Sequence, residues 1–152
     1  YQDGEIIEIE CYNQKVLTED ATGPLDAFGH NRRIIRYADV LLMAAEAMNE
    51  NGKPGEALSF LNMVRERARG GNPNILPDIT TTDQNELRNL IWFERRSELA
   101  MEQERWFDLK RQGRMAEKLE PLGFIAGKHE LLPIPQQEID LSEGALTQNP
   151  NW

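Results

Sequence analysis

Two stretches of regularly spaced apolar residues, separated by one short turn, constrain the fold of this chain most. In the first stretch, apolar side chains recur every three or four residues between residues 34 and 48, which is the period of one helical face. A second stripe consists of Ala57, Leu58, Leu61, Val64 and Ala68. In the intervening NENGKPG, Gly52 ends one helix and Pro54 starts the next. Helices joined by so short a turn are predicted to pack antiparallel.

The segment YADVLLMAAEAMNENGKPGEALSFLNMVRERA therefore resembles a tetratricopeptide-type helical hairpin. Only one copy of such a unit is visible in the sequence. A single hairpin cannot bury its apolar face alone, so it requires neighbours. Either the later helices or further repeats of a longer protein would supply them.

A third helix is predicted to begin at Asp83, which forms a capping box with Glu86, and to run well past Leu99. The pair Trp-Phe occurs twice along it, at 92/93 and 106/107, and fourteen residues is close to four helical turns. Because this helix is apolar almost all round, it is expected to be buried almost all round. The predicted core aromatics are Trp92, Phe93, Trp106 and Phe107.

Charged residues lie on or beside these apolar stripes. Burial of an unpaired charge is costly, so these groups are expected to pair with one another across the helices. The predicted ion network joins the first helix to the third through Arg36, Asp39, Glu46, Glu94, Arg95 and Glu98.

The two ends of the chain carry weaker patterns. Residues 1–30 are predicted to be loop with one short strand, because EIIEIECY alternates and TGPLDAFGHN is rich in turn formers. Residues 114–152 are predicted to form a short helix around Met115 to Leu119 and a wrapping tail with one helical turn beginning at Pro135. The fold is thus predicted to be mainly α, with helices over 31–113, and residues 1–152 are taken as one domain.

Composition excludes several classes of protein. A formal net charge of -9 disfavours a nucleic-acid binder, whose surface must concentrate basic residues. No apolar run approaches the roughly 20 residues that span a bilayer. The chain begins with Tyr1 rather than Met, which favours a mature product or a piece of a longer protein. Its single cysteine cannot form an internal disulfide.

Each candidate catalytic or metal-binding motif in the sequence lacks a feature that its chemistry requires. HELLP begins like a zinc-protease motif, but Pro133 occupies the place of the second histidine. The carboxylates of Glu94 and Glu98 could suggest a glycoside hydrolase, yet neighbouring arginines would keep both ionised. We predict no enzymatic activity, no metal and no cofactor, and a glycoside hydrolase stays a remote alternative.

Four segments taken together resemble the C-terminal region of the SusD/RagB family of nutrient-binding outer-membrane lipoproteins. They are NRRIIRYADVLLMAAEAMNENG, ALSFLNMVRERA, LIWFERRSELAMEQERWFDLKRQG and HELLPIPQQEIDLSEGALTQNPNW, in this order. The resemblance covers about residues 31–152. The family often has Tyr at the position of Ala44, Gly at that of Gln103, and Gly-Tyr where this chain ends in Asn151 and Trp152.

The resemblance implies a largely helical protein that captures an oligosaccharide or other nutrient oligomer. It further implies an anchor at the cell surface through an N-terminal lipidated cysteine, and a TonB-dependent transporter barrel as partner. Family members are several times longer than this chain, so the chain is expected to be a largely structural C-terminal part. A helical-repeat scaffold that binds a protein partner is the alternative.

Sugar-contacting residues are therefore few. Among aromatic residues in loops or termini, Tyr12 and Trp152 are the candidates for ligand contact. Asn13, Gln14 and Lys15 beside Tyr12 could bond sugar hydroxyls, although the pattern favours a tyrosine that anchors a strand. Since sugar sites generally need several rings, the chain alone is expected to bind glycan weakly or not at all.

Overall fold

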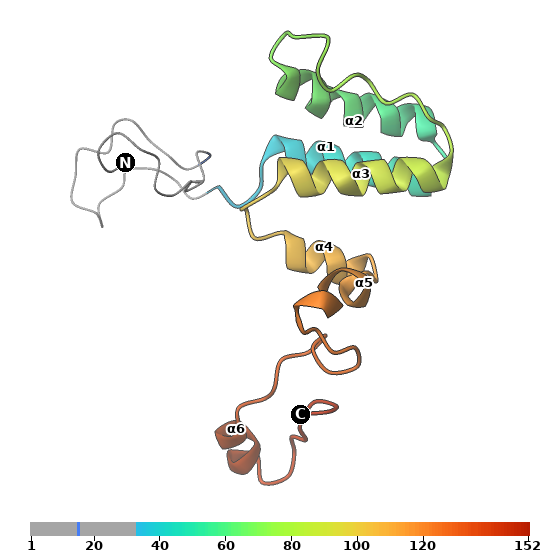
Figure 1. Cartoon of the computed structure of the whole chain (residues 1–152). Helices are drawn as coiled ribbons and strands as arrows, with labels where there is room; N and C mark the ends of the chain where they lie inside the picture. Colours follow the sequence, from blue (N-terminus) through green and yellow to red (C-terminus); the bar gives the residue numbers. More distant parts are fainter. Residues whose placement is uncertain (1–14, 16–32) are drawn as a thin grey trace, which may run out of the picture. The chain divides into compact units, whose positions relative to one another are not determined.

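The computed structural model describes Lys15 and residues 33–152, and the chain divides into two compact units, Tyr1–Thr80 and Thr81–Trp152. Within the described ranges every regular element is a helix, which confirms the predicted mainly α class (Figure 1). The strand expected in residues 1–30 lies outside these ranges. The assignment of 1–152 to one domain stays a prediction. None of the described helices is long and apolar enough to cross a bilayer.

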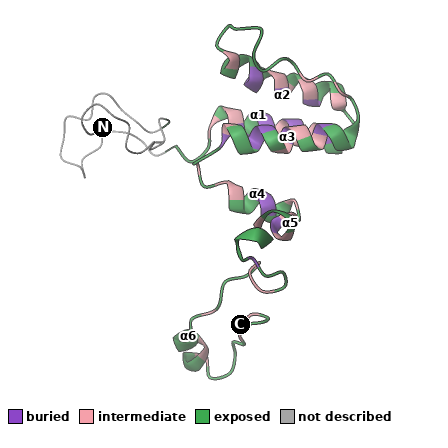
Figure 2. Ribbon diagram, in the orientation of Figure 1, coloured by how far each residue is buried: buried purple, intermediate pink, exposed green. Residues whose placement is uncertain are grey.

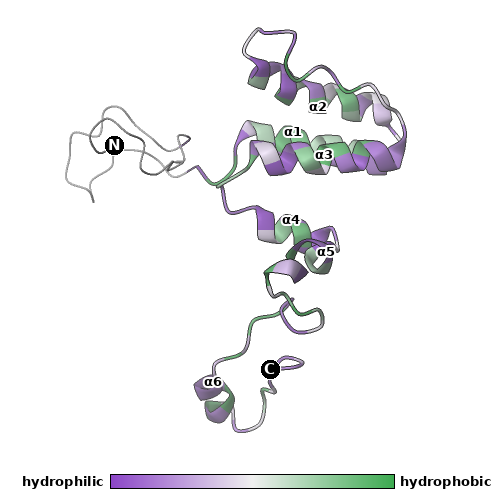
Figure 3. Ribbon diagram, in the orientation of Figure 1, coloured by the Kyte–Doolittle hydropathy of each residue, from purple (hydrophilic) through white to green (hydrophobic). Residues whose placement is uncertain are grey.

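The first unit contains the predicted hairpin of α1 (Tyr37–Glu50) and α2 (Pro54–Arg69), which pack against each other. Gly52 in the turn has φ 72°, a conformation that glycine adopts without steric cost. The buried face consists of Leu41, Leu42, Ala45, Ala57, Leu61 and Val64 (Figure 2). Figure 3 shows hydrophobic and hydrophilic residues on both helices, as expected where one face is buried.

The start of α1 corrects the sequence prediction. The apolar stripe was expected to include Ile34 and Ile35, but both are exposed and precede the helix. Arg36 has an extended backbone with φ -111° and ψ 154°, so the helix begins only at Tyr37. Ile34 and Ile35 form a bend before the helix, in keeping with the lower helix propensity of β-branched residues.

An irregular segment after α2 satisfies the polar groups of that helix. Arg65 is buried, and its Nε and Nη2 atoms donate to the Pro77 carbonyl at 3.1 and 2.9 Å. Asn62 exchanges two hydrogen bonds with the backbone of Ile79, both of 2.9 Å. The segment after α2 forms no helix or strand of its own. Side chains of α2 hold it through hydrogen bonds to its backbone.

The second unit starts with α3 (Gln84–Glu98), whose N-terminus follows the predicted cap. The Asp83 side chain accepts a 2.8 Å hydrogen bond from the Glu86 N–H. The Glu86 carboxylate in turn accepts from the Thr81 hydroxyl at 2.6 Å. Asp83 thus caps the helix as predicted, and Glu86 binds Thr81, two residues before the cap.

The predicted long third helix is broken. Helix α3 ends at Glu98, and α4 (Arg105–Arg111) begins after a six-residue connection, Leu99–Glu104. Met101 and Gln103 in this connection have φ values of 68° and 71°. Left-handed residues cannot continue a right-handed helix, so the two Trp-Phe pairs lie on separate helices.

The remaining elements are short. They are α5 (Met115–Leu119), the 3-10 turn η2 (Glu120–Leu122) and α6 (Gln136–Leu141). Helix α5 and the turn after Pro135 confirm the sequence predictions. Leu109, Met115 and Phe124 form a small core, against which Ala116 and Leu119 pack.

Candidate functional site

A buried carboxylate joins α3 to α4. The Nε atom of Arg95 lies 3.2 and 3.3 Å from the two carboxylate oxygens of Asp108, and these side chains are only 4% and 5% exposed. Arg111 donates from Nε and Nη2 to Oδ1 of the same carboxylate, at 3.0 and 2.9 Å. Asp108 therefore receives two guanidinium groups, which offsets the desolvation of its charge.

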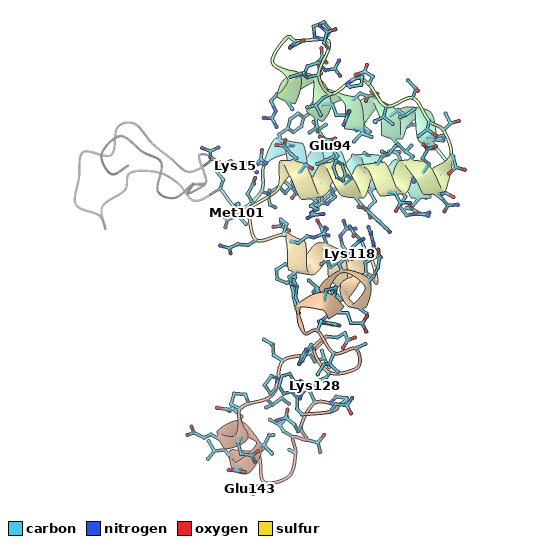
Figure 4. The ribbon with its side chains drawn as sticks, in the orientation of Figure 1. Lys15, Glu94, Met101, Lys118, Lys128 and Glu143 are labelled. Atoms are coloured by element: carbon cyan, nitrogen blue, oxygen red, sulfur yellow. The ribbon has the colours of Figure 1, made fainter. Side chains whose placement is uncertain are left out.

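Beside Asp108 lies a pocket of about 390 Å³. Its wall contains four cationic residues, Arg95, Arg96, Arg105 and Lys118, and two acidic residues, Glu104 and Asp108. Figure 4 shows Lys118 on α5. The rest of the wall consists of Leu99, Ala100, Met101, Gln103, Leu109, Leu119 and Leu122.

Cations crowd around this pocket. Burial, with Arg96 and Arg114 nearby, lowers the pKa of Arg105, whereas Asp108 acts in the opposite direction. Burial first, and then the two neighbouring guanidinium groups, disfavour the charged form of Arg105. An anion placed in the pocket would reduce this repulsion.

A second pocket, of about 380 Å³, lies among aromatic rings of α4 and the C-terminal tail. Trp106 and Phe124 make an edge contact with centroids 6.3 Å apart, and Phe124 contacts His129 at 5.7 Å. His129 in turn lies 5.5 Å from Trp152. The fold therefore brings together rings that are far apart in sequence, and each ring contacts the next.

The polar and cationic neighbours of Trp152 hold its ring in place. The indole Nε1–H lies 3.1 Å from each of the Lys128 and Leu131 carbonyls. The Lys128 ammonium lies 4.4 Å from the ring centroid, a cation–π contact. His129 Nδ1 accepts from the Ile125 N–H at 3.0 Å, which fixes the imidazole beside the indole.

Amide side chains attach the last residues to an earlier part of the tail. Gln148 bonds both the N–H and the carbonyl of Ile134, at 2.8 and 2.9 Å. Asn149 Nδ2 donates to the Leu132 carbonyl at 2.6 Å, and Asn151 Nδ2 to that of Gly127 at 2.8 Å. The QNPNW end thus serves as an anchor made of side-chain to backbone hydrogen bonds.

The predicted core aromatics are placed unequally. Phe93 and Phe107 are 62% and 64% exposed in the described chain, and their place in a core stays a prediction. Trp106 is 40% exposed, and Trp92 is half-buried under the Arg114 guanidinium, 5.2 Å from its ring. Trp92 and Phe93 lie on α3 and Trp106 and Phe107 on α4, so the single continuous helix that the prediction assumed does not form.

The residues of the predicted ion network differ in burial. Asp39, Glu94 and Arg95 are buried, and Arg36, Glu46 and Glu98 are half-buried; Figure 4 shows Glu94 on α3. The network's link between the first and third helices stays a prediction.

The structure adds a partner that the predicted network lacked, namely Asp108, which binds Arg95. The available signal was the row of charges that Asp108 shares with Glu94 in a helical projection.

Only one of the two predicted ligand-contact residues, Tyr12 and Trp152, lies in the described part of the chain. Tyr12 lies outside the described residues. Trp152 is 44% exposed and lines the aromatic pocket, but its indole N–H is already bonded within the chain. His129 of the HELLP segment belongs to the same ring cluster. Among the described residues, no group of three metal-binding side chains occurs.

Comparisons with known proteins agree on one family. The sequence model of the SusD family matches residues 10–123. SusD-like protein P2 of Formosa agariphila is 41% identical over 127 residues, which are 78% of this chain and 25% of that protein. SusD-like protein P25 of the same organism is 38% identical over 125 residues, 76% of this chain and 23% of the relative.

Solved structures show the same relationship. The crystal structure of a SusD homolog from Bacteroides thetaiotaomicron has a TM-score of 0.69 and 34% identity, and the match covers 78% of this chain and 26% of that one. A SusD-like protein from Bacteroides fragilis has a TM-score of 0.64 and 29% identity, with 78% and 25% covered. The chain spans about a quarter of the length of these relatives. From its sequence and its helical fold alike, the chain belongs to the SusD family.

Proposed function

We propose that this chain is the largely structural C-terminal part of a non-enzymatic, glycan- or nutrient-binding lipoprotein. The protein would lie at the surface of the outer membrane, anchored by a lipid outside this segment, and would deliver its ligand to a TonB-dependent transporter barrel. Membership of the SusD family supports the class of function.

One observation carries the structural role of the chain: the contacts of Trp152 are internal. Its N–H is satisfied by two carbonyls, and Lys128 and His129 contact its ring. A sugar that stacks on a ring must also find hydrogen-bond partners for the hydroxyls that it removes from water. The neighbouring amides of Gln148 and Asn149 are already bonded to backbone. The tail therefore offers little spare capacity to a glycan.

Titration calorimetry tests this proposal. The 152-residue chain, and a protein of the length of its relatives that contains it, are titrated with a panel of plant and host oligosaccharides. Only the longer protein is expected to reach a low micromolar Kd, equivalent to about -8 kcal/mol. Low micromolar binding by the 152-residue chain itself would contradict the structural role.

A helical scaffold that binds a protein partner is the second candidate. It requires the exposed rings of Phe93 and Phe107 to belong to one apolar patch, because contiguous patches mark interaction surfaces. In the longer protein, Phe93→Ser and Phe107→Ser should abolish copurification of a partner protein without changing glycan affinity if this reading is correct. Unchanged copurification would exclude these rings as the contact surface.

A further inference from the structure

The pocket beside Asp108 holds more positive than negative charge, although the chain as a whole has a formal net charge of -9. The carboxylate of Asp108 is occupied by Arg95 and Arg111. The Lys118 ammonium lies 2.6 Å from a Glu117 oxygen, so it too has a counter-ion.

Arg96 and Arg105 differ from these residues. Within residues 33–152, neither guanidinium forms an ion pair with a carboxylate. Glu104 is the remaining acidic residue of the wall. Two arginines therefore share one wall with a single acid that is not already paired. Charged groups in a concave, partly apolar site act on a ligand more strongly than they would in bulk water.

The form of the pocket limits the ligand further. Its volume of about 390 Å³ falls within the range of roughly 300 to 1,000 Å³ typical of small-molecule sites. Four leucines, Ala100 and Met101 give the wall an apolar part, which suits a ligand with one anionic group and a less polar body. The planar fork of a guanidinium matches the paired oxygens of a carboxylate or sulfate.

We propose that this pocket binds the carboxylate or sulfate group of an acidic sugar, through Arg96 and Arg105. The sugar part of the inference rests on the proposed function; the anion part rests on the pocket alone. Half-burial of Arg105 and its crowding by Arg96 and Arg114 make an anion the expected ligand, because its charge would reduce their mutual repulsion.

The experiment is a titration followed by calorimetry and by the NMR signals of the arginine Nε–H groups, in a protein of the length of the relatives. The probes are sodium glucuronate, glucose 6-sulfate, inorganic sulfate and neutral glucose, at ionic strength held constant with sodium chloride. Saturable binding of at least one acidic sugar is expected, at least tenfold tighter than that of glucose. Inorganic sulfate should compete, and the two acidic sugars tell carboxylate from sulfate recognition.

Arg96→Gln and Arg105→Gln should each weaken this binding at least tenfold. The matched control is Lys53→Gln, which removes an exposed cation of the turn before α2, paired with Glu56 at 3.1 Å, and should change nothing. The inference is overturned if no acidic sugar saturates, if glucose binds equally well, or if the control weakens binding as much as the arginine variants. Where a variant fails to fold, shifts of the Arg96 and Arg105 Nε–H signals on addition of sulfate to the unsubstituted protein test the same pocket, and unchanged signals overturn the inference.

A separate titration with neutral oligosaccharides keeps the two proposals distinct. Binding of neutral glycans without any binding of acidic sugars would overturn this inference and leave the proposed function standing. Binding of acidic sugars that persists where neutral glycans fail would support the pocket and contradict only the broader ligand range.

Discussion

At the scale of single residues, Gln103 shows how one backbone conformation interrupts a helix. Its φ of 71° lies in the left-handed region, which costs a non-glycine residue roughly 1 to 2 kcal/mol. The family resemblance places Gly at this position, and the backbone supplies the reason. We predict that Gln103→Gly raises the free energy of unfolding by about 1 kcal/mol, since the relief of strain exceeds the added chain entropy of glycine. Urea denaturation of the variant measures the change.

Gln103→Ala is the control for this prediction. Alanine removes the glutamine side chain, as glycine does, but keeps the left-handed penalty. The difference between the two variants therefore reports on the backbone alone. If the glycine variant is no more stable than the alanine variant, the left-handed backbone at this position carries no measurable strain, and the prediction is wrong.

Asp108 provides a second prediction at the residue scale. Replacing it with Asn removes the charge that neutralises buried Arg95, and breaking such a pair typically costs about 3 to 5 kcal/mol. Arg111→Gln is the control, because Arg111 is half-exposed and exposed ion pairs contribute at most about 1 kcal/mol. Equal losses in the two variants, measured by urea denaturation, would contradict the assignment of Asp108 as the buried centre.

At the scale of elements, the first turn of α5 has a stability that depends on pH. Hydrogen bonds from Arg114 and Lys118 lower the pKa of Glu117 from 4.5 to about 2. A depressed folded-state pKa means that the carboxylate stabilises the fold above pH 4.5 and that this contribution is lost as the pH falls towards 2. Glu117→Gln should therefore flatten the dependence of stability on pH within this window. Urea midpoints between pH 2 and 6 measure it, and parallel curves for the two proteins would refute the prediction.

The amide anchor of the tail is also an element-scale feature. Gln148→Ala leaves the N–H and carbonyl of Ile134 without their partner, so hydrogen exchange at Ile134 should accelerate at least tenfold. Gln137→Ala, an exposed position in α6, is the control and should leave that rate unchanged. A rate at Ile134 that does not respond to Gln148→Ala would show that the anchor contributes nothing to local order.

Helix ends were predicted correctly where a proline, a glycine or a capping residue marks them. Pro54 and Gly70 bound α2, Asp83 caps α3, and Pro135 precedes α6. The connection between α3 and α4 contains neither glycine nor proline. The sequence therefore gives no signal that would end a helix there. No local rule could therefore have located the break, since it depends on left-handed backbone at Met101 and Gln103.

At the scale of the whole molecule, the sequence by itself determined the helical class, the hairpin of α1 and α2, and membership of the SusD family, because these follow from periodicity, caps and motif order within short windows. Tertiary structure decided which residues distant in sequence contact one another. It brought Asp108 to Arg95, thirteen residues away, and Trp152 to His129. It also left Phe93 and Phe107 exposed. Helical spacing fixes only which side of a helix a residue occupies. Which partner meets that side depends on where the chain turns between them, and in this sequence the turn after α3 contains no glycine or proline to mark it.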